Sequence, residues 1–379
     1  MSLITRYLLR QFLGPLLVCL VAFNGIFILF DLFGHLSRFL DANLPLPAIL
    51  KYYAGVVCTY THWFLPASCM LATLYTMWQL SHHSELTAMR ASGISFHRLT
   101  LPFFCVAVLA SLLAFANAEL LAPGLSAWSD RLKESGFAHA TPGPTEKFNY
   151  TNPAASRTWR IASIDTSSVE ACAHLFVPSN AADRLPAQAV EIKRVVDGRI
   201  VWGVAARRAD YLDGIWWLSG PEMIRIDPYD GSVLPDTDPS RPRVPLPDPL
   251  PFPELTETPR DLHIEARQWD YLSASDMLRR LLSSRDDSDE HWFDFWYRLA
   301  APWACLVITL LSIPTGITTG RQSVFKGVVL ALATFFLFYL FSITLKYLGQ
   351  KGYMPPVLAA WLPNAVFLAI GLGLYRRLT

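Results

Sequence analysis

The sequence predicts an α-helical membrane protein with six transmembrane helices and an all-β domain inserted between the third and fourth. Three observations lead to this fold class. Only 17% of the 379 residues are charged, whereas a typical soluble domain has about 25%. Of the 31 Asp and Glu residues, 26 lie between Asp130 and Glu290. Long apolar stretches flank this acidic middle on both sides, so we expect the middle alone to be surrounded by water.

Six stretches are apolar over the roughly 20 residues that a helix needs to span a bilayer core about 30 Å thick. They run from about Phe12 to Phe30, Tyr52 to Leu80, Leu99 to Leu121, Trp292 to Pro314, Gly327 to Leu345 and Val357 to Tyr375. The first is longer than the ~7–15-residue core of a cleaved signal, and no A-x-A-like site follows it, so we expect it to be retained. The expected domains are therefore residues 1–124 (helices one to three), 125–290 (the β domain) and 291–379 (helices four to six).

Lys and Arg residues in the short loops predict the orientation. With a cytoplasmic N-terminus, the inner segments carry eight of them, namely Arg6, Arg10, Arg90, Arg98, Arg321, Lys326, Arg376 and Arg377. The outer short loops carry four, namely Arg38, Lys51, Lys346 and Lys351. This excess predicts a multi-pass inner-membrane protein with both termini in the cytoplasm and the large domain in the periplasm.

The middle domain has the pattern of short β-strands separated by turns. Alternating residues favour strands at Arg157–Ile161, Ala189–Lys193, Arg199–Trp202, Gly214–Leu218 and Met223–Ile226. This spacing is typical of a sandwich or jelly roll. The nine prolines between Leu234 and Pro259 favour an extended loop, and a short helix is expected from Ser273 to Leu282. The tryptophans of this domain either form an ordinary core or line an apolar path; they are Trp159, Trp202, Trp216 and Trp217.

No sequence motif indicates catalysis. The chain has no G-x-x-x-x-G-K-[ST] phosphate loop, no G-x-S-x-G elbow and no H-E-x-x-H. Asp227–Gly231 resembles a calcium loop, but its third position is Tyr where an oxygen ligand is needed. We therefore expect no catalytic residue, no metal and no cofactor in this chain. The net charge of +1 gives no reason to expect nucleic-acid binding.

The predicted cytoplasmic segment Ser81–Arg98 contains a short helix at residues 84–93. Ser84 can cap this helix, Glu85 suits its first turn, and Gly93 suits its end. Leu86 and Met89 lie on one face because they are three residues apart. The residues alone support a connecting loop and a docking helix for a cytoplasmic partner equally well.

The stretch Ser84-Glu-Leu-Thr-Ala-Met-Arg-Ala-Ser-Gly-Ile94 resembles a signature of the lipopolysaccharide-export permeases, the LptF/LptG family. Weaker matches follow in the family's order along the whole chain. They are Arg6-Tyr7, Glu119-Leu-Leu-Ala-Pro123, Arg298-Leu-Ala-Ala-Pro302, Pro314, Pro355-Pro356 and Trp361-Leu-Pro-Asn364. The position of the β domain also matches.

The resemblance implies a transport subunit rather than an enzyme. In this family two permeases, usually one of each type, pair in the inner membrane above a dimer of a separate cytoplasmic ABC ATPase, which binds the ATP and Mg²⁺. Lipopolysaccharide enters between the first helix of one permease and the fifth of its partner and passes through periplasmic jelly rolls to a bridge protein. The short helix docks in the ATPase, which implies that role for Glu85, Leu86, Met89, Arg90, Ser92 and Gly93.

The first helix departs from the family pattern. Members of the G type carry several lysines there that meet lipid phosphates, whereas this chain reads Ile26-Phe-Ile-Leu-Phe-Asp31-Leu-Phe-Gly-His35. The sequence therefore leaves the F or G type open. Asp294 and Arg298 are expected to pair at i, i+4, with a lipid-phosphate contact of Arg298 as the alternative. The candidate substrate residues are Asp31, His35, Arg38, Arg298 and Lys346.

Three functions remain in competition. The first is transport of lipopolysaccharide or a related glycolipid. The second is a membrane-anchored periplasmic interaction protein without transport activity. The third, a lipid-modifying membrane enzyme, is disfavoured because the sequence has no intramembrane acid–base or metal cluster. Only a transporter needs a cytoplasmic docking helix, so residues 84–93 favour the first.

Overall fold

The computed structural model describes residues 3–134, 137, 145–152, 155–164, 190–196, 199–224, 246–266, 269–284, 288–317 and 324–378. The chain divides into two compact units. The helical unit spans Met1–Ala140 and Ser288–Thr379, and the β unit spans Thr141–Asp287. Each unit is described by itself.

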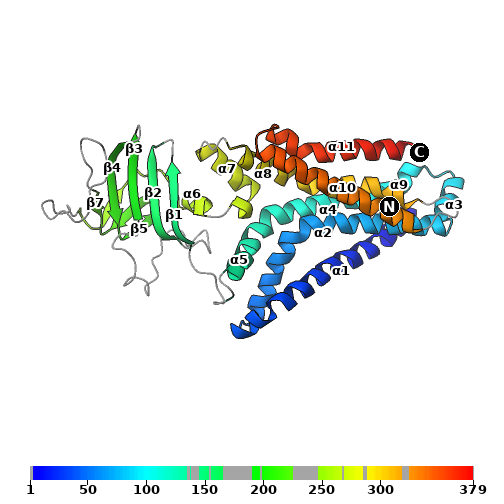
Figure 1. Cartoon of the computed structure of the whole chain (residues 1–379), viewed down its shortest axis with the longest axis horizontal. Helices are drawn as coiled ribbons and strands as arrows, with labels where there is room; N and C mark the ends of the chain where they lie inside the picture. Colours follow the sequence, from blue (N-terminus) through cyan, green and yellow to red (C-terminus); the bar gives the residue numbers. More distant parts are fainter. Residues whose placement is uncertain are drawn as a thin grey trace. The chain divides into compact units, whose positions relative to one another are not determined.

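Long helices joined by short turns make up the helical unit (Figure 1). Before the β unit they are α1 (Leu3–Asp41), α2 (Leu46–His82), α3 (Glu85–Ala91), α4 (Phe96–Ala116), the π-helical segment η1 (Asn117–Leu121) and α5 (Ala122–Glu134). After it come α8 (Asp289–Ala300), the 3-10 turn η4 (Ala301–Trp303), α9 (Ala304–Gly316), α10 (Val324–Gln350) and α11 (Pro356–Arg376). Because α4, η1 and α5 continue as one helix, the expected start of the β domain at residue 125 lies inside a helix.

Among the described residues, five helices are long and apolar enough to cross a membrane. They are Leu3–Asp41, Phe96–Lys133, Asp289–Gly316, Gly327–Gln350 and Pro356–Arg376. The second expected crossing lies in α2, which is 37 residues long but is not among these five. A helix inside a bundle needs less apolar surface than one facing lipid, and α2 packs along α1, α5 and α9. A sixth crossing through α2 stays a prediction.

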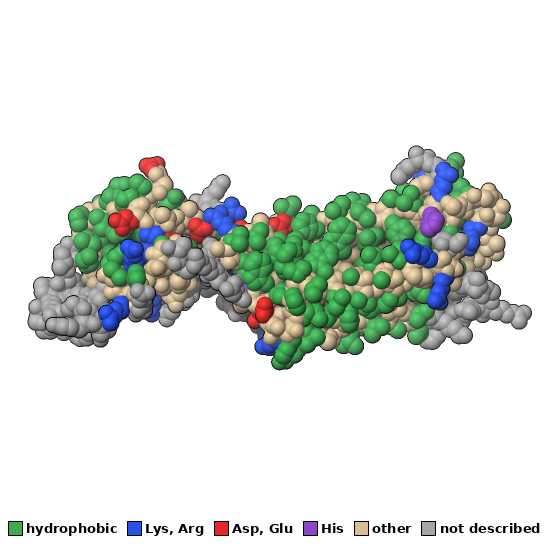
Figure 2. All heavy atoms as spheres, turned by 90° about the horizontal axis from the view of Figure 1, so that it is seen from above, with side chains coloured by type: hydrophobic (Ala, Val, Ile, Leu, Met, Phe, Trp, Pro, Cys, Tyr) green, Lys and Arg blue, Asp and Glu red, His purple; other side chains and the backbone are tan. Residues whose placement is uncertain are grey.

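Both ends of the chain lie at the end of the helical unit that carries α3 (Figure 1). Figure 2 shows hydrophobic side chains over the middle of the visible face of this unit, with Lys and Arg side chains gathered near that same end. A belt of apolar surface with charges beyond it is what a bilayer-spanning unit requires.

The described strands of the β unit form two antiparallel sheets. The five-stranded sheet has the order β1-β2-β3-β4-β7 and consists of β1 (Thr145–Asn152), β2 (Arg157–Ile164), β3 (Val190–Val196), β4 (Arg199–Ala206) and β7 (Glu222–Met223). The three-stranded sheet has the order β5-β6-β8 and consists of β5 (Arg208–Leu212), β6 (Ile215–Ser219) and β8 (Leu250–Phe252). Each of the five predicted strand segments overlaps a strand. The jelly roll itself stays a prediction.

Part of the predicted proline-rich loop is a strand. The expectation of a loop is wrong at β8, where Phe252 pairs with Trp216 of β6. Pro251 is tolerated there because β8 lies at the edge of its sheet, where a missing N–H breaks no ladder bond on the open side. Residues 234–245 of the predicted loop lie outside the described residues. Beyond β8 come α6 (Pro259–Ala266), η3 (Trp269–Tyr271) and α7 (Ala274–Ser284), and α7 covers most of the predicted short helix.

Two of the four candidate tryptophans form the core of the β unit. Trp159 and Trp216 are fully buried, with ring centroids 5.2 Å apart. Trp216 also donates its indole N–H to the carbonyl of Glu257 at 2.6 Å. Trp202 is only partly buried at the margin of this core. An aromatic pair packed this closely stabilises the unit itself.

A buried ion pair fastens the chain after β8 to the five-stranded sheet. Arg157 Nε donates to Glu257 Oε1 at 2.9 Å, and the two side chains are only 8% and 0% exposed. The same guanidinium donates to the carbonyl of Glu254 and to the hydroxyl of Thr256. Asn152 of β1 donates to Glu257 as well. Four donors thus bond to this segment, two of them to Glu257 Oε1, while Glu257 Oε2 is buried without a hydrogen-bond partner.

Replacing Arg157 with Met should destabilise the β unit by roughly 3–5 kcal/mol, because the Glu257 carboxylate would be left buried without its cation. The matched control is Arg208→Met. Arg208 lies 2.8 Å from Asp210 but is 47% exposed, and exposed pairs contribute about 1 kcal/mol or less. Urea unfolding of the full chain measures the stability of both variants, with cleavage by a protease within residues 199–224 as the signal for unfolding of the β unit. Equal midpoints for the two variants would contradict a structural role for the buried pair.

Candidate functional site

The short helix α3 is anchored to the helical unit through its inward face. Leu86 is only 6% exposed and belongs to the same apolar cluster as Leu8, Leu99 and Phe103. Met89 is half-buried against that cluster. Leu86 therefore holds α3 on the bundle and is not available for direct contact with a partner.

The two ends of α3 are built differently from each other. Ser84 has a left-handed backbone, φ 59°, and only its carbonyl serves the helix, accepting from Ala88 N at 2.9 Å. The predicted side-chain cap is therefore wrong, since a capping side chain requires an extended backbone at this position. Gly93, at φ 87°, ends the helix and donates its N–H to the Arg90 carbonyl at 3.0 Å.

Glu85 joins α3 to the beginning of α1. Its Oε2 accepts a hydrogen bond from the Tyr7 hydroxyl at 2.8 Å. Gln11 Nε2 in turn donates to the Tyr7 oxygen at 2.8 Å. Sequence reasoning missed this link because residues 7 and 85 lie far apart in the chain. The only signal for it was the Arg6-Tyr7 match to the family.

The outward face of α3 consists of exposed residues. They are Thr87, Ala88, Arg90, Ala91 and Ser92. The guanidinium of Arg90 lies 5.8 Å from the Phe96 ring, and Ser92 Oγ bonds back to the Met89 carbonyl. Of the six predicted docking residues, Arg90, Ser92 and Gly93 are thus exposed. Thr87, Ala88 and Ala91, which were not predicted, complete the accessible surface.

The opposite end of α1 holds a carboxylate within a hydrogen-bonded group. The side chain of Asp31 is 9% exposed and accepts from the Tyr52 hydroxyl at 3.1 Å. His35 Nδ1 lies 3.4 Å from Asp31 Oδ1, and Lys133 Nζ lies 3.9 Å from it. Asp31 and His35 therefore serve the packing of α1 against α2 and α5.

Around this group the end of α1 is closed by aromatic rings. Phe39, Tyr52 and Phe137 form one buried cluster. The Phe39 and Phe137 centroids are 4.7 Å apart, and the Tyr52 ring lies within 6 Å of both. This packing fixes the C-terminal end of α1.

Three predicted outer cations remain at the surface. Arg38, Lys51 and Lys346 are all exposed, and Lys51 Nζ lies 4.4 Å from the centroid of the Trp128 ring. Of these, Arg38 and Lys346 belong to the candidate substrate residues. Exposed cations at the outer ends of membrane helices either bind an anionic group or anchor the helix at the interface.

Arg298 has a structural partner inside the helical unit. Its Nη2 donates to the carbonyl of Ala118, in the π-helical segment η1, at 3.0 Å. A π turn displaces carbonyls from the regular helical ladder, so an outside donor is needed there. Asp294 accepts from Gln350 Nε2 at 3.1 Å. The ion pair between Asp294 and Arg298 stays a prediction.

Within the part of the chain that the structure describes, no group of three or more His, Cys, Asp or Glu residues is arranged to hold a metal. The geometry is thus that of a membrane bundle with a small anchored helix at the end that carries both termini. What this arrangement does is decided by comparison with known proteins.

A family model described as "Lipopolysaccharide export system permease LptF/LptG" matches residues 6–377. The chain belongs to the LptF/LptG family. It is similar to the LptF proteins of Escherichia coli strain K12 and Shigella flexneri, each 23% identical over 381 residues, covering 98% of this chain and 94% of the relative. The family expected from the residues 84–94 signature is confirmed.

In this LptF/LptG member, Tyr7→Phe should loosen α3 without unfolding the bundle. The variant loses one hydrogen bond to a carboxylate, worth about 1 kcal/mol at this exposed position. Hydrogen exchange at the amides of Glu85–Ala91 should become roughly fivefold faster. The control is Tyr75→Phe, in α2, where the ring is 46% exposed. Unchanged exchange in Tyr7→Phe would show that Leu86 alone holds α3.

Proposed function

We propose that this chain is an F-type permease subunit of an ABC transporter that extracts lipopolysaccharide, or a related glycolipid, from the inner membrane. The family match over residues 6–377 carries this proposal. The F type is favoured because the similar relatives are LptF proteins and because the first helix lacks the lysines of the G type. A second permease, a cytoplasmic ATPase dimer and a periplasmic bridge protein are its proposed partners.

The proposed topology has six crossings, with α2 as the sixth. An even number of crossings returns the chain to its starting side, which fits the position of both termini beside α3 (Figure 1). The excess of Lys and Arg on that side favours the cytoplasm. The β unit then lies in the periplasm, where we propose that it forms a jelly roll in the path of the glycolipid.

The proposed docking surface for the ATPase is the outward face of α3. Thr87, Ala88 and Ala91 are small and exposed, so a groove in the partner can approach the helix backbone closely. Behind them Leu86 is buried in the bundle. A displacement of α3 by the ATPase is therefore transmitted to the bundle through Leu86 and to α1 through Glu85.

Ala88→Arg should abolish co-purification of the ATPase, because a long charged side chain would stand in the docking groove. Glu85→Lys should weaken the association as well, since it reverses a charge and breaks the bond to Tyr7. The control is Ser37→Arg, an equally exposed position at the other end of α1. An ATPase retained at wild-type yield by Ala88→Arg would place the docking surface elsewhere.

The wild-type chain in the same experiment separates transport from the competing function. A membrane-anchored periplasmic interaction protein has no use for an ATPase and would co-purify without one. A transport subunit brings it down from native membranes in a stoichiometric complex.

The proposed entrance for the glycolipid lies between α1 of one permease and α10 of its partner. In the most apolar stretch of α1 only 6% of the residues are buried within the chain. The surface of this stretch is therefore available to lipid or to a second permease. The α10 stretch Gly327–Leu345 carries no charge. Helices that pack without hydrogen bonds between them separate more easily. Arg38 and Lys346 lie exposed at the outer ends of these helices, where an anionic head group would reach them.

Reversing Arg38 and Lys346 to Glu together should reduce the glycolipid bound to the purified complex about tenfold or more, because each cation near an anionic head group contributes about 1 kcal/mol. The control reverses Arg98 and Arg376 at the end that carries α3. The ratio of bound glycolipid to protein, measured by mass spectrometry, should fall only in the first variant. Unchanged binding would reduce Arg38 and Lys346 to interface anchors.

A further inference from the structure

A polar pocket lies inside the helical unit where α2, α8, η4, α9, α10 and α11 meet. Its polar lining residues are His62, Tyr297, Tyr339, Ser342 and Asn364. The remaining wall is apolar. The volume of the pocket that the centre of a water molecule can occupy is about 20 Å³. One bound water needs about 10–15 Å³ measured in this way.

Asn364 of α11 is the group that makes this pocket unusual. The residue is 8% exposed, and its Nδ2 donates to the Ala300 carbonyl at 2.7 Å. That carbonyl lies directly before the 3-10 turn η4, where the Ala304 N–H bonds to Ala301 and not to Ala300, so a lone pair of the Ala300 oxygen is left for a side chain. The other amide atom, Asn364 Oδ1, is buried and has no hydrogen-bond partner.

The orientation of this amide is fixed by its neighbour. Turning it over would bring two oxygens, Oδ1 and the Ala300 carbonyl, to 2.7 Å with no proton between them. Oδ1 is therefore the atom left over, and it can only accept. Buried acceptors in folded proteins nearly always have a donor, so a donor is missing from this pocket.

Three of the other four polar groups of the pocket have their protons committed to backbone carbonyls. His62 Nδ1 lies 2.7 Å from the Thr59 carbonyl and must carry the proton, which leaves Nε2 as an acceptor in the neutral ring. Ser342 donates its proton to the Phe338 carbonyl at 2.8 Å and keeps its lone pairs. Tyr339 donates to the His62 carbonyl at 3.4 Å. A group with O–H donors suits this lining.

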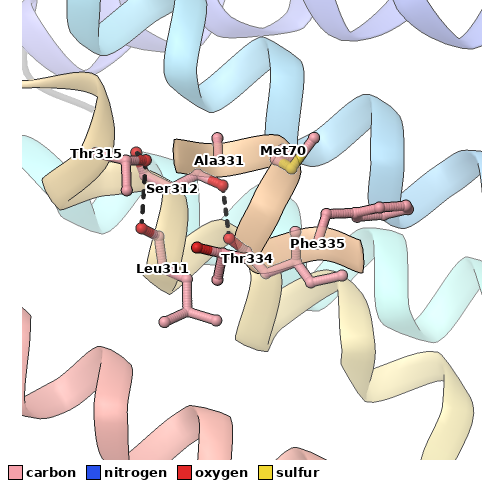
Figure 3. A pocket seen from close by; sticks show the side chains of 8 residues that line it. Met70, Leu311, Ser312, Thr315, Ala331, Thr334 and Phe335 are labelled. Atoms are coloured by element: carbon pink, nitrogen blue, oxygen red, sulfur yellow. Dashed lines mark hydrogen bonds between the residues drawn. The ribbon is translucent and has the colours of Figure 1, made fainter. Parts of the chain in front are cut away.

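A second hollow between α2, α9 and α10 provides the contrast (Figure 3). Its hydroxyl groups are satisfied by their own helices. Ser312 donates to the Ile308 carbonyl, Thr315 to that of Ser312, and Thr334 to that of Leu330. No side-chain atom among the described residues of this hollow is buried without a partner. It therefore calls for no ligand.

We propose that the pocket around Asn364 is a binding site for one hydroxyl group, which donates to Asn364 Oδ1. Two sources have this chemistry, a water molecule and a hydroxyl carried by a lipid chain, and the small volume favours water. Bound there, the hydroxyl bridges α11 to the helices that carry His62 and Ser342. The site depends on the helical unit alone and not on the proposed transport function.

X-ray radiolytic footprinting of the full chain in nanodiscs with ¹⁸O-labelled water tests this site, since a bound water releases hydroxyl radicals beside its neighbours. Tyr339 is only 8% exposed and should nevertheless incorporate ¹⁸O as readily as Tyr353, which is 76% exposed. Asn364→Leu removes the acceptor and should lower labelling of Tyr339 about fivefold, because the loss of one hydrogen bond weakens binding of the water by about that factor. Thr334→Val, in the second hollow, should leave it unchanged.

A second variant covers the case in which Asn364→Leu does not fold, because it also removes the side-chain hydrogen bond to the Ala300 carbonyl. Ala360→Val narrows the pocket with Asn364 intact and should lower the labelling as well. If Tyr339 is labelled only after lipid is removed, and the labelling still depends on Asn364, then water enters only when lipid has left. That result identifies a lipid hydroxyl as the natural occupant. Absence of labelling both with and without lipid would overturn the site, as would labelling that persists in both variants.

Discussion

Inside a bilayer no water is available to backbone groups, so every N–H and C=O must find its partner within the protein. Most of the helical unit obeys this constraint by unbroken helices, and its buried hydroxyls bond back to their own helix, as Thr73 does to Cys69 and Thr309 to Cys305. The exceptions are the informative places. At two places where a helix departs from regular α geometry, a side chain from a distant part of the sequence supplies a bond.

Two such departures organise the bundle. The π-helical segment η1 is bonded by Arg298, which comes from α8, while its Asn117 donates to the Cys58 carbonyl of α2. The carbonyl of Ala300, directly before the 3-10 turn η4, accepts from Asn364 of α11. In each case one polar contact joins elements that are remote in sequence, so loss of the side chain would affect the packing of two helices at once. This makes a structural role sufficient to explain Arg298, which sequence reasoning had placed near the substrate.

The sequence predicted what local pattern determines and missed what tertiary contacts determine. Apolar length located five membrane helices, and alternation located strands such as β3 and β6. The edge strand β8 was missed because its three residues become a strand only by pairing with β6. In the candidate site, the position of α3 was predictable from its residues. The burial of Leu86, the bond from Tyr7 to Glu85 and the enclosure of Asp31 were not, because each depends on which helices pack together.

These contacts give α1 an unusual mechanical position. Near its beginning it is held by Leu8 and Phe12 in the core and by Tyr7 on Glu85. Near its end it is held by Phe39 and by Asp31 on Tyr52. Between these two attachments it packs on α2, as Phe27 does on Tyr60, but few of its residues are buried within the chain. A helix fixed at both ends moves as one body when either attachment moves. If the proposed ATPase displaces α3, the exposed middle of α1 is where that motion would reach the surrounding lipid.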